Sequence, residues 1–244
     1  MAIGVWLLAV GVCDLLRATR DTTSWRRRFL LVALGVTLLI FAAVGLDLHA
    51  TDWALVVPVW VLGLVSWVVG SSLALDPSTS VRGRWRAAAF ASFAAPLAAL
   101  ALLGGAATTD ARLPDLFTGS LLADVGPVRV LLVLGVIVFQ LSTANLVVRL
   151  LLDAIGVPAL ANEKRLKGGR LLGPMERLFI LVLGLAGELT AAAVVVAAKA
   201  LLRFPELQRT ASEEGPTDVS EYFLIGSFAS WLLALGGLVL VRLG

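Results

Sequence analysis

The sequence has few of the residues on which soluble folds and soluble enzymes depend. Charged residues make up only 15% of its 244 positions, and it has one cysteine, one histidine and one tyrosine. A single cysteine, Cys13, excludes an internal disulfide, and a single histidine, His49, excludes a metal site built from several histidines. A Walker loop, a dinucleotide fingerprint and a nucleophile elbow are also missing, so we expect neither a cofactor nor a metal.

Apolar residues are correspondingly abundant. The chain is 59% hydrophobic with a mean hydropathy of +0.94, whereas soluble domains are about 45–50% apolar and about 25% charged. Runs of about 20 apolar residues can cross a hydrocarbon core of about 30 Å, and open strand edges cannot exist in lipid. The sequence therefore predicts an all-α, polytopic bundle in the lipid bilayer, with one transmembrane domain over residues 1–244. Seven spans are predicted, at residues 2–16, 29–46, 53–75, 85–104, 127–154, 174–203 and 221–242.

Arginine and lysine are distributed unevenly between alternate loops. Segments 17–28, 76–86 and 155–177, together with Arg242, carry fourteen of these residues, and the alternate loops carry five. Short cytoplasmic loops collect arginine and lysine, so this pattern predicts the N-terminus outside and the C-terminus in the cytoplasm. The basic pI near 9.6 is explained by these flanking residues, which face headgroups, and no nucleic-acid partner is expected.

The predicted sixth span, residues 174–203, carries charges within an apolar helix. Arg177, Glu188 and Lys199 are spaced by eleven residues, and positions eleven apart in a helix differ by only about 20° in direction. Arg203 follows Lys199 by four, so all four side chains are expected on one side. The rise per residue places Glu188 near the midplane, about 16 Å from Arg177 and from Lys199. Because a charge there costs about 2.5–3.5 kcal/mol, Glu188 is expected to face the bundle, as a functional group or in a structural interhelical hydrogen bond.

A second polar stripe is predicted on the fifth span, where Ser142, Asn145, Arg149 and Asp153 recur every three or four residues. We expect this stripe to face the sixth span and to join other polar residues in a cluster at the inner end. The expected substrate or ion path consists of Asp14, Arg17, Asn145, Arg149, Asp153, Glu176, Arg177 and Glu188. At the outer end we expect Glu221 to be within reach of Lys199 or Arg203 for an ion pair. The candidates for binding phosphate are Gly169, Arg170 and Arg177.

The C-terminal part of the chain contains three distinctive words. They are "GRLLGPMERLFIL" from Gly169, "AAKALLRFPEL" at 197–207 and "EYFLIGSFASW" at 221–231. In this order they resemble the C-terminal region of an uncharacterised family of bacterial multipass membrane proteins. The resemblance implies a location in the bacterial plasma membrane and names no reaction. The residues that match the family pattern are Gly169, Arg170, Gly173, Glu176, Arg177, Lys199, Arg203, Phe204, Glu221, Tyr222 and Gly226.

Three functions are compatible with these patterns. The leading hypothesis is a small transporter or channel that moves a proton, ion or small solute along the polar path. The runner-up is a membrane-embedded enzyme or binder for a lipid, isoprenoid or phosphate headgroup. In that case Arg149, Arg170 and Arg177 would hold phosphate, and Glu176 or Glu188 would be the catalytic acid or base. The third is a structural or assembly subunit, with a second copy or another membrane protein as partner.

Overall fold

The computed structural model describes residues 1–18, 24–46, 48–76, 79, 81–103, 126–156, 169–198, 201 and 218–244. Within these residues all regular structure is helical, which confirms the predicted all-α class. The chain divides into two compact units, which we call the N-terminal unit, Met1–Thr143, and the C-terminal unit, Ala144–Leu243.

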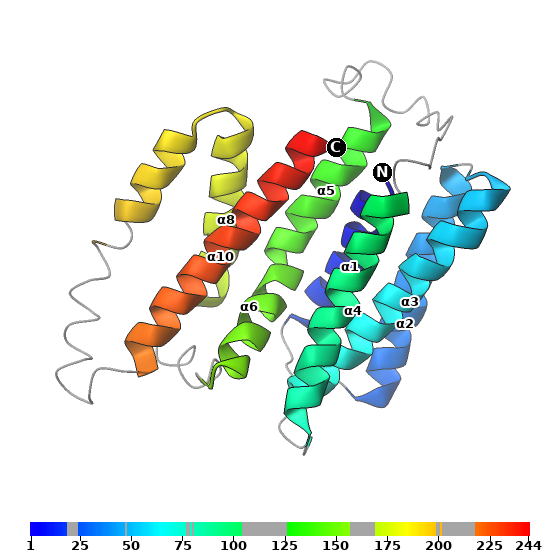
Figure 1. Ribbon diagram of the computed structural model, residues 1–244, viewed down its shortest axis with the longest axis horizontal. Coiled ribbons are helices and arrows are strands. Elements are labelled where there is room, and N and C mark those ends of the chain that lie inside the picture. The colour runs from blue at the N-terminus through cyan, green and yellow to red at the C-terminus, as the bar shows by residue number, and fades with distance from the viewer. Residues whose placement is uncertain are drawn as a thin grey trace. The chain divides into compact units, whose positions relative to one another are not determined.

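The N-terminal unit is a bundle built around its first helix (Figure 1). Although it has only 16 residues, α1 contacts the other four helices of the unit. Trp6, Val10 and Cys13 on α1 are fully buried, as expected for a helix that is apolar on all sides. The helices are α1 (Ala2–Arg17), α2 (Trp25–Gly45), α3 (Ala50–Ala74), α4 (Arg82–Leu103) and α5 (Pro127–Leu141).

Small residues allow α1 and α5 to pack closely. A Cβ atom added to Gly4 would lie 2.6 Å from the Cα atom of Leu132, and one added to Gly11 would lie 2.8 Å from a methyl group of Val138. Gly135 of α5 faces the backbone of Gly4 in the same way. Close backbone approach at small residues is the usual basis of helix association in lipid, where hydrophobic burial supplies little driving force.

Among the described residues, four helices are long and apolar enough to cross a membrane: α2, α3, α4 and residues Phe223–Leu243 of α10 (Asp218–Leu243). A fifth is added if α5 and α6 (Thr143–Ala154) are counted as one bent span. Large apolar side chains such as Phe41, 77% exposed, and Leu102, 85% exposed, point away from the bundle. These features fit a multipass membrane protein, but the predicted count of seven spans is not confirmed.

The C-terminal unit contains α6, α8 (Gly169–Leu185), a short apolar helix at Leu189–Ala198, and α10. The short helix packs against α8 and α10, because Ala192 shares a buried cluster with Ile180 and Ala234. In Figure 1 the chain leaves α8, turns and runs back along it. A second cluster joins Leu152 of α6 with Ile225 of α10.

Two of the predicted spans each contain two helices instead of one. The predicted span 127–154 is interrupted at Ser142, whose φ of −126° and ψ of −70° separate α5 from α6. The predicted span 174–203 begins earlier, at Gly169, and its helix ends at Leu185.

Candidate functional site

The first buried polar group lies in the N-terminal unit and consists of Asp14, Arg17, Trp67, Ser71 and Ser72, which we call the N-terminal polar set. Each of these residues has an exposed fraction of 5% or less. Arg17 donates from Nε to Oδ1 of Asp14 at 2.8 Å and from Nη2 to the same oxygen at 2.5 Å. The other carboxylate oxygen accepts a hydrogen bond from the Trp67 indole at 2.9 Å.

The remaining hydrogens of the Arg17 guanidinium are directed at α3. Nη2 donates to Ser71 Oγ at 2.8 Å, and Nη1 donates to Ser72 Oγ at 2.9 Å and to the Val68 carbonyl at 3.5 Å. Five bonds therefore match the five N–H donors of an arginine. Both serines in turn donate to α3 carbonyls one turn earlier, a common arrangement for buried serines.

All five N–H donors of Arg17 have acceptors within the N-terminal unit, and this limits the roles that the N-terminal polar set can have. The charge of Arg17 is offset by a carboxylate in direct contact, and its donors are directed at oxygens of Asp14 and α3. Arg17 also lies in the last turn of α1, where a cation is favoured by the helix dipole. The set is thus suited to fixing α1 against α3, and it presents neither a spare donor of Arg17 nor an uncompensated charge to a ligand.

The second buried polar group lies in the C-terminal unit and consists of Asn145, Arg177 and Ser230, which we call the C-terminal polar set. Arg177 occupies the middle of α8 and is 1% exposed. Its Nη2 donates to Oδ1 of Asn145 on α6 at 2.5 Å, and its Nη1 donates to Oγ of Ser230 on α10 at 2.8 Å. One guanidinium therefore connects three helices.

The two side chains that accept hydrogen bonds from Arg177, those of Asn145 and Ser230, are polar but uncharged. Asn145 and Ser230 orient the guanidinium, and Glu176, the preceding residue, attracts it electrostatically. Gly173 lies one turn earlier on α8, and a Cβ atom there would be 3.4 Å from Nη1 of Arg177 and 3.7 Å from Oδ1 of Asn145. The backbone thus lies directly beside the guanidinium.

The other polar residues of α6 continue from Asn145. Arg149 and Asp153 follow at spacings of four residues, so the three share one face of α6. Both Arg149 and Asp153 are partly buried, and Nε and Nη2 of Arg149 are shielded from solvent. Ser142 does not belong to this stripe: it lies at the break before α6 and donates to the Gly11 carbonyl of the N-terminal unit at 2.7 Å.

The predicted position of Glu188 is wrong. Gly187 has a φ of +87°, a conformation that glycine adopts freely and other residues do not. Its N–H bonds to the Gly184 carbonyl at 3.3 Å, and the Glu188 N–H bonds to the Leu183 carbonyl at 2.8 Å. This pair of bonds is the Schellman motif that terminates helices.

Glu188 is consequently exposed in the turn between two helices and does not pack into the bundle. Its carbonyl accepts the first hydrogen bond of the following helix, from Ala192 at 3.2 Å, so Glu188 is the N-cap of that helix. An acidic side chain is favoured there by the helix dipole. The eleven-residue periodicity that linked Arg177, Glu188 and Lys199 is lost.

Of the residues expected in one inner cluster, some belong to the N-terminal polar set and others to the C-terminal polar set. Asp14 and Arg17 bind α3 of the N-terminal unit, whereas Asn145 and Arg177 bind each other in the C-terminal unit. Gly169 and Arg170 form the first residues of α8, and Glu221 lies near the start of α10; their side chains are outside the described part of the chain. Lys199 and Arg203 also lie outside the described residues.

Sequence reasoning missed four members of the polar sets: Trp67, Ser71, Ser72 and Ser230. A signal was present, because serines and an indole N–H within apolar spans require partners. Among the described residues, no three His, Cys, Asp or Glu side chains lie together in a way that could hold a metal ion. Comparisons with protein-family models, with curated proteins and with solved structures found no match for this chain.

Proposed function

We propose that this protein is a multipass membrane transporter or channel for a small anion, with Arg177 as the anion-binding residue. The observation that carries the proposal is the position of this guanidinium, 1% exposed in the middle of α8 and oriented by two neutral side chains. Ionisable residues that face the interior of a membrane helix bundle commonly mark substrate or ion pathways.

The chemistry of arginine favours an anionic solute over a proton or a cation. A guanidinium stays charged and offers a planar fork of donors that matches carboxylate and phosphate oxygens. Asn145 and Ser230 hold this fork from α6 and α10. The stripe formed by Asn145, Arg149 and Asp153 extends from Arg177 toward the C-terminal end of α6 and is the polar path that we propose for the solute.

The contrast with Arg17 supports this choice of site. Both arginines are almost completely buried, but Arg17 contacts a carboxylate and donates five hydrogen bonds within the bundle. Arg17 therefore fits a structural role, whereas Arg177 lies between three helices of the C-terminal unit, beside the polar stripe of α6. Glu188, exposed in a turn, is no longer part of the proposed path.

The test is anion flux through the purified protein in proteoliposomes, measured with chloride, inorganic phosphate and a small carboxylate. Arg177→Gln should lower flux of the transported anion roughly tenfold or more, because truncating a buried charged partner costs about 2–5 kcal/mol. Arg177→Lys keeps the charge and should retain part of the flux. Arg129→Gln, which removes an exposed arginine from the first turn of α5, is the matched control and should have no effect.

Flux no higher than in protein-free liposomes, from protein that elutes as a folded species, would overturn the proposal. So would an equal loss in the Arg177→Gln and Arg129→Gln proteins. The charge-conserving lysine variant separates a requirement for positive charge from a general loss of packing.

The membrane topology and the bacterial origin of the protein are proposals as well. We propose that the N-terminus lies outside and that the arginine-rich end of the N-terminal unit faces the cytoplasm; the predicted seven spans and cytoplasmic C-terminus are not part of this proposal, because the chain turns after α8 and runs back along it. The bonds of Arg27 to Leu16 and of Arg28 to Asp76 support this orientation, because they bring two arginine-rich segments to one end of the N-terminal unit. The resemblance of residues 169–231 supports membership in the bacterial membrane-protein family and a place in the bacterial plasma membrane.

A further inference from the structure

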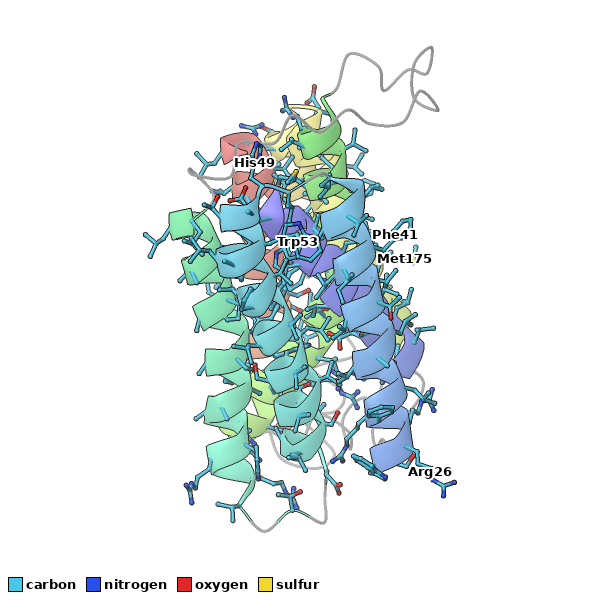
Figure 2. All side chains as sticks on the ribbon, turned by 90° about the vertical axis from the view of Figure 1, so that its right-hand side faces the viewer. Arg26, Phe41, His49, Trp53 and Met175 are labelled. Atoms are coloured by element: carbon cyan, nitrogen blue, oxygen red, sulfur yellow. The ribbon has the colours of Figure 1, made fainter. Side chains whose placement is uncertain are left out.

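One end of the N-terminal unit carries exposed arginines and tryptophans from two helices. They are Trp25 and Arg26 at the beginning of α2 and Arg82, Arg84 and Trp85 at the beginning of α4, and we call this surface the arginine end. Figure 2 shows Arg26 projecting from this end, with His49 and Trp53 at the opposite end of the unit. Trp25 is 75% exposed.

Two neighbouring arginines hold the arginine end together. Arg27 donates from Nη2 to the Leu16 carbonyl at 2.9 Å, which attaches the beginning of α2 to the end of α1. Arg28 forms an ion pair of 3.5 Å with Asp76, which attaches it to the connection between α3 and α4. These two side chains act within the unit, whereas Arg26 and Arg84 extend into solvent.

We propose that the arginine end binds the headgroups of anionic phospholipids. The exposed surface of α2 changes from Trp25 and Arg26 to Phe29 and Leu30, 61% and 65% exposed, within about one turn. That change places the arginines at the level of the phosphates, because apolar side chains enter the hydrocarbon and tryptophan prefers the interface. The Trp25 and Phe29 rings lie 6.1 Å apart and form the aromatic border between the two regions.

Guanidinium groups at this depth discriminate lipids by charge. Phosphatidylglycerol has a net negative charge and phosphatidylcholine has none, so exposed arginines attract the first. Near an anionic membrane each arginine contributes roughly a fivefold gain in affinity. Arg129 of α5 lies at the other end of the unit and is also exposed. Among the described residues it stands alone there, without a group of arginines like that of the arginine end.

The experiment counts lipids bound to the purified protein by native mass spectrometry during titration with phosphatidylglycerol or phosphatidylcholine of identical acyl chains. Wild type should bind phosphatidylglycerol more tightly, and high salt should weaken the preference. Arg84→Gln should weaken phosphatidylglycerol binding roughly fivefold, and Arg26→Gln with Arg84→Gln roughly 25-fold. Arg129→Gln is the matched control at the other end and should have no effect.

Three results would overturn the proposal: equal binding of the two lipids by wild type, an equal loss in the Arg84→Gln and Arg129→Gln proteins, or displacement of the lipid by millimolar inorganic phosphate. Phosphate displacement would assign the surface to a free anion. Arg84→Lys keeps the charge and should retain the preference, which separates an electrostatic effect from misfolding. None of these outcomes depends on anion flux, so this proposal stands or fails separately from the role of Arg177.

Discussion

Replacing Asp14 by alanine should destabilise the N-terminal unit strongly. The substitution removes both hydrogen bonds that Asp14 accepts from Arg17 and the one that it accepts from Trp67. It leaves an arginine that is 5% exposed without the carboxylate that offsets its charge. Breaking a buried ion pair from one side costs about 3–5 kcal/mol, and an unpaired buried indole N–H adds about 1–3 kcal/mol.

The double replacement Asp14→Leu with Arg17→Met should cost less than either single replacement. Once both charges are removed, no buried ion needs a partner, and replacing such a pair by apolar residues is often close to neutral. Ser71 and Ser72 keep their bonds to α3 carbonyls in this variant. The Trp67 N–H stays unpaired, so we expect a residual loss of about 1–3 kcal/mol.

The assay is reversible unfolding in detergent micelles, with helix content and tryptophan fluorescence followed as a denaturing detergent is added. Wild type, Asp14→Leu, Arg17→Met and the Asp14→Leu/Arg17→Met double variant complete a double-mutant cycle, which isolates the coupling between the two positions; Asp14→Ala is measured beside them. The reasoning is refuted if the two single losses add in the double variant, or if Asp14→Ala costs less than about 1 kcal/mol.

Two further predictions concern the backbone packing of α1 against α5 and the turn after α8. Gly4→Ala should lower the free energy of unfolding by about 1–3 kcal/mol, because the new methyl group would lie 2.6 Å from the backbone of Leu132. Gly236→Ala is the control, because a methyl group there would have nothing within 4 Å, and it should show little change in the same unfolding assay. Gly187→Ala should lose about 1–2 kcal/mol, because alanine resists a φ of +87°. A Gly187→Ala protein as stable as wild type would show that the turn after α8 is not under this constraint.

The helices of the N-terminal unit were predictable because each is a long apolar run bounded by charge. The predicted spans 2–16, 29–46, 53–75 and 85–104 agree with α1 to α4 within a few residues. Hydropathy averages over many residues, so it locates such runs and is insensitive to a single turn.

The same averaging explains the error at Glu188. Apolar residues continue on both sides of it, and glycine is common enough in membrane helices that Gly187 alone did not indicate an end. The hydrogen bonds that end α8 depend on the φ of Gly187, which is a property of the folded backbone. A glycine followed directly by an acidic residue, the C′ and N-cap pattern, was the local signal.

The polar sets were predictable only in part. Asn145 and Arg177 were expected in one cluster, and they are hydrogen-bonded. The partners of Asp14 and Arg17 on α3 lie more than fifty positions away, and helical periodicity within one span carries no information about which spans meet.

The proposed function requires Arg177 as the anion-binding residue and does not involve Glu188. The most direct test is the ratio of anion flux in two variants, Glu188→Gln and Arg177→Gln, reconstituted at equal density with equal helix content. We expect flux near the wild-type value for Glu188→Gln and a roughly tenfold or greater loss for Arg177→Gln. Loss of flux in Glu188→Gln with flux retained in Arg177→Gln would contradict the proposed function.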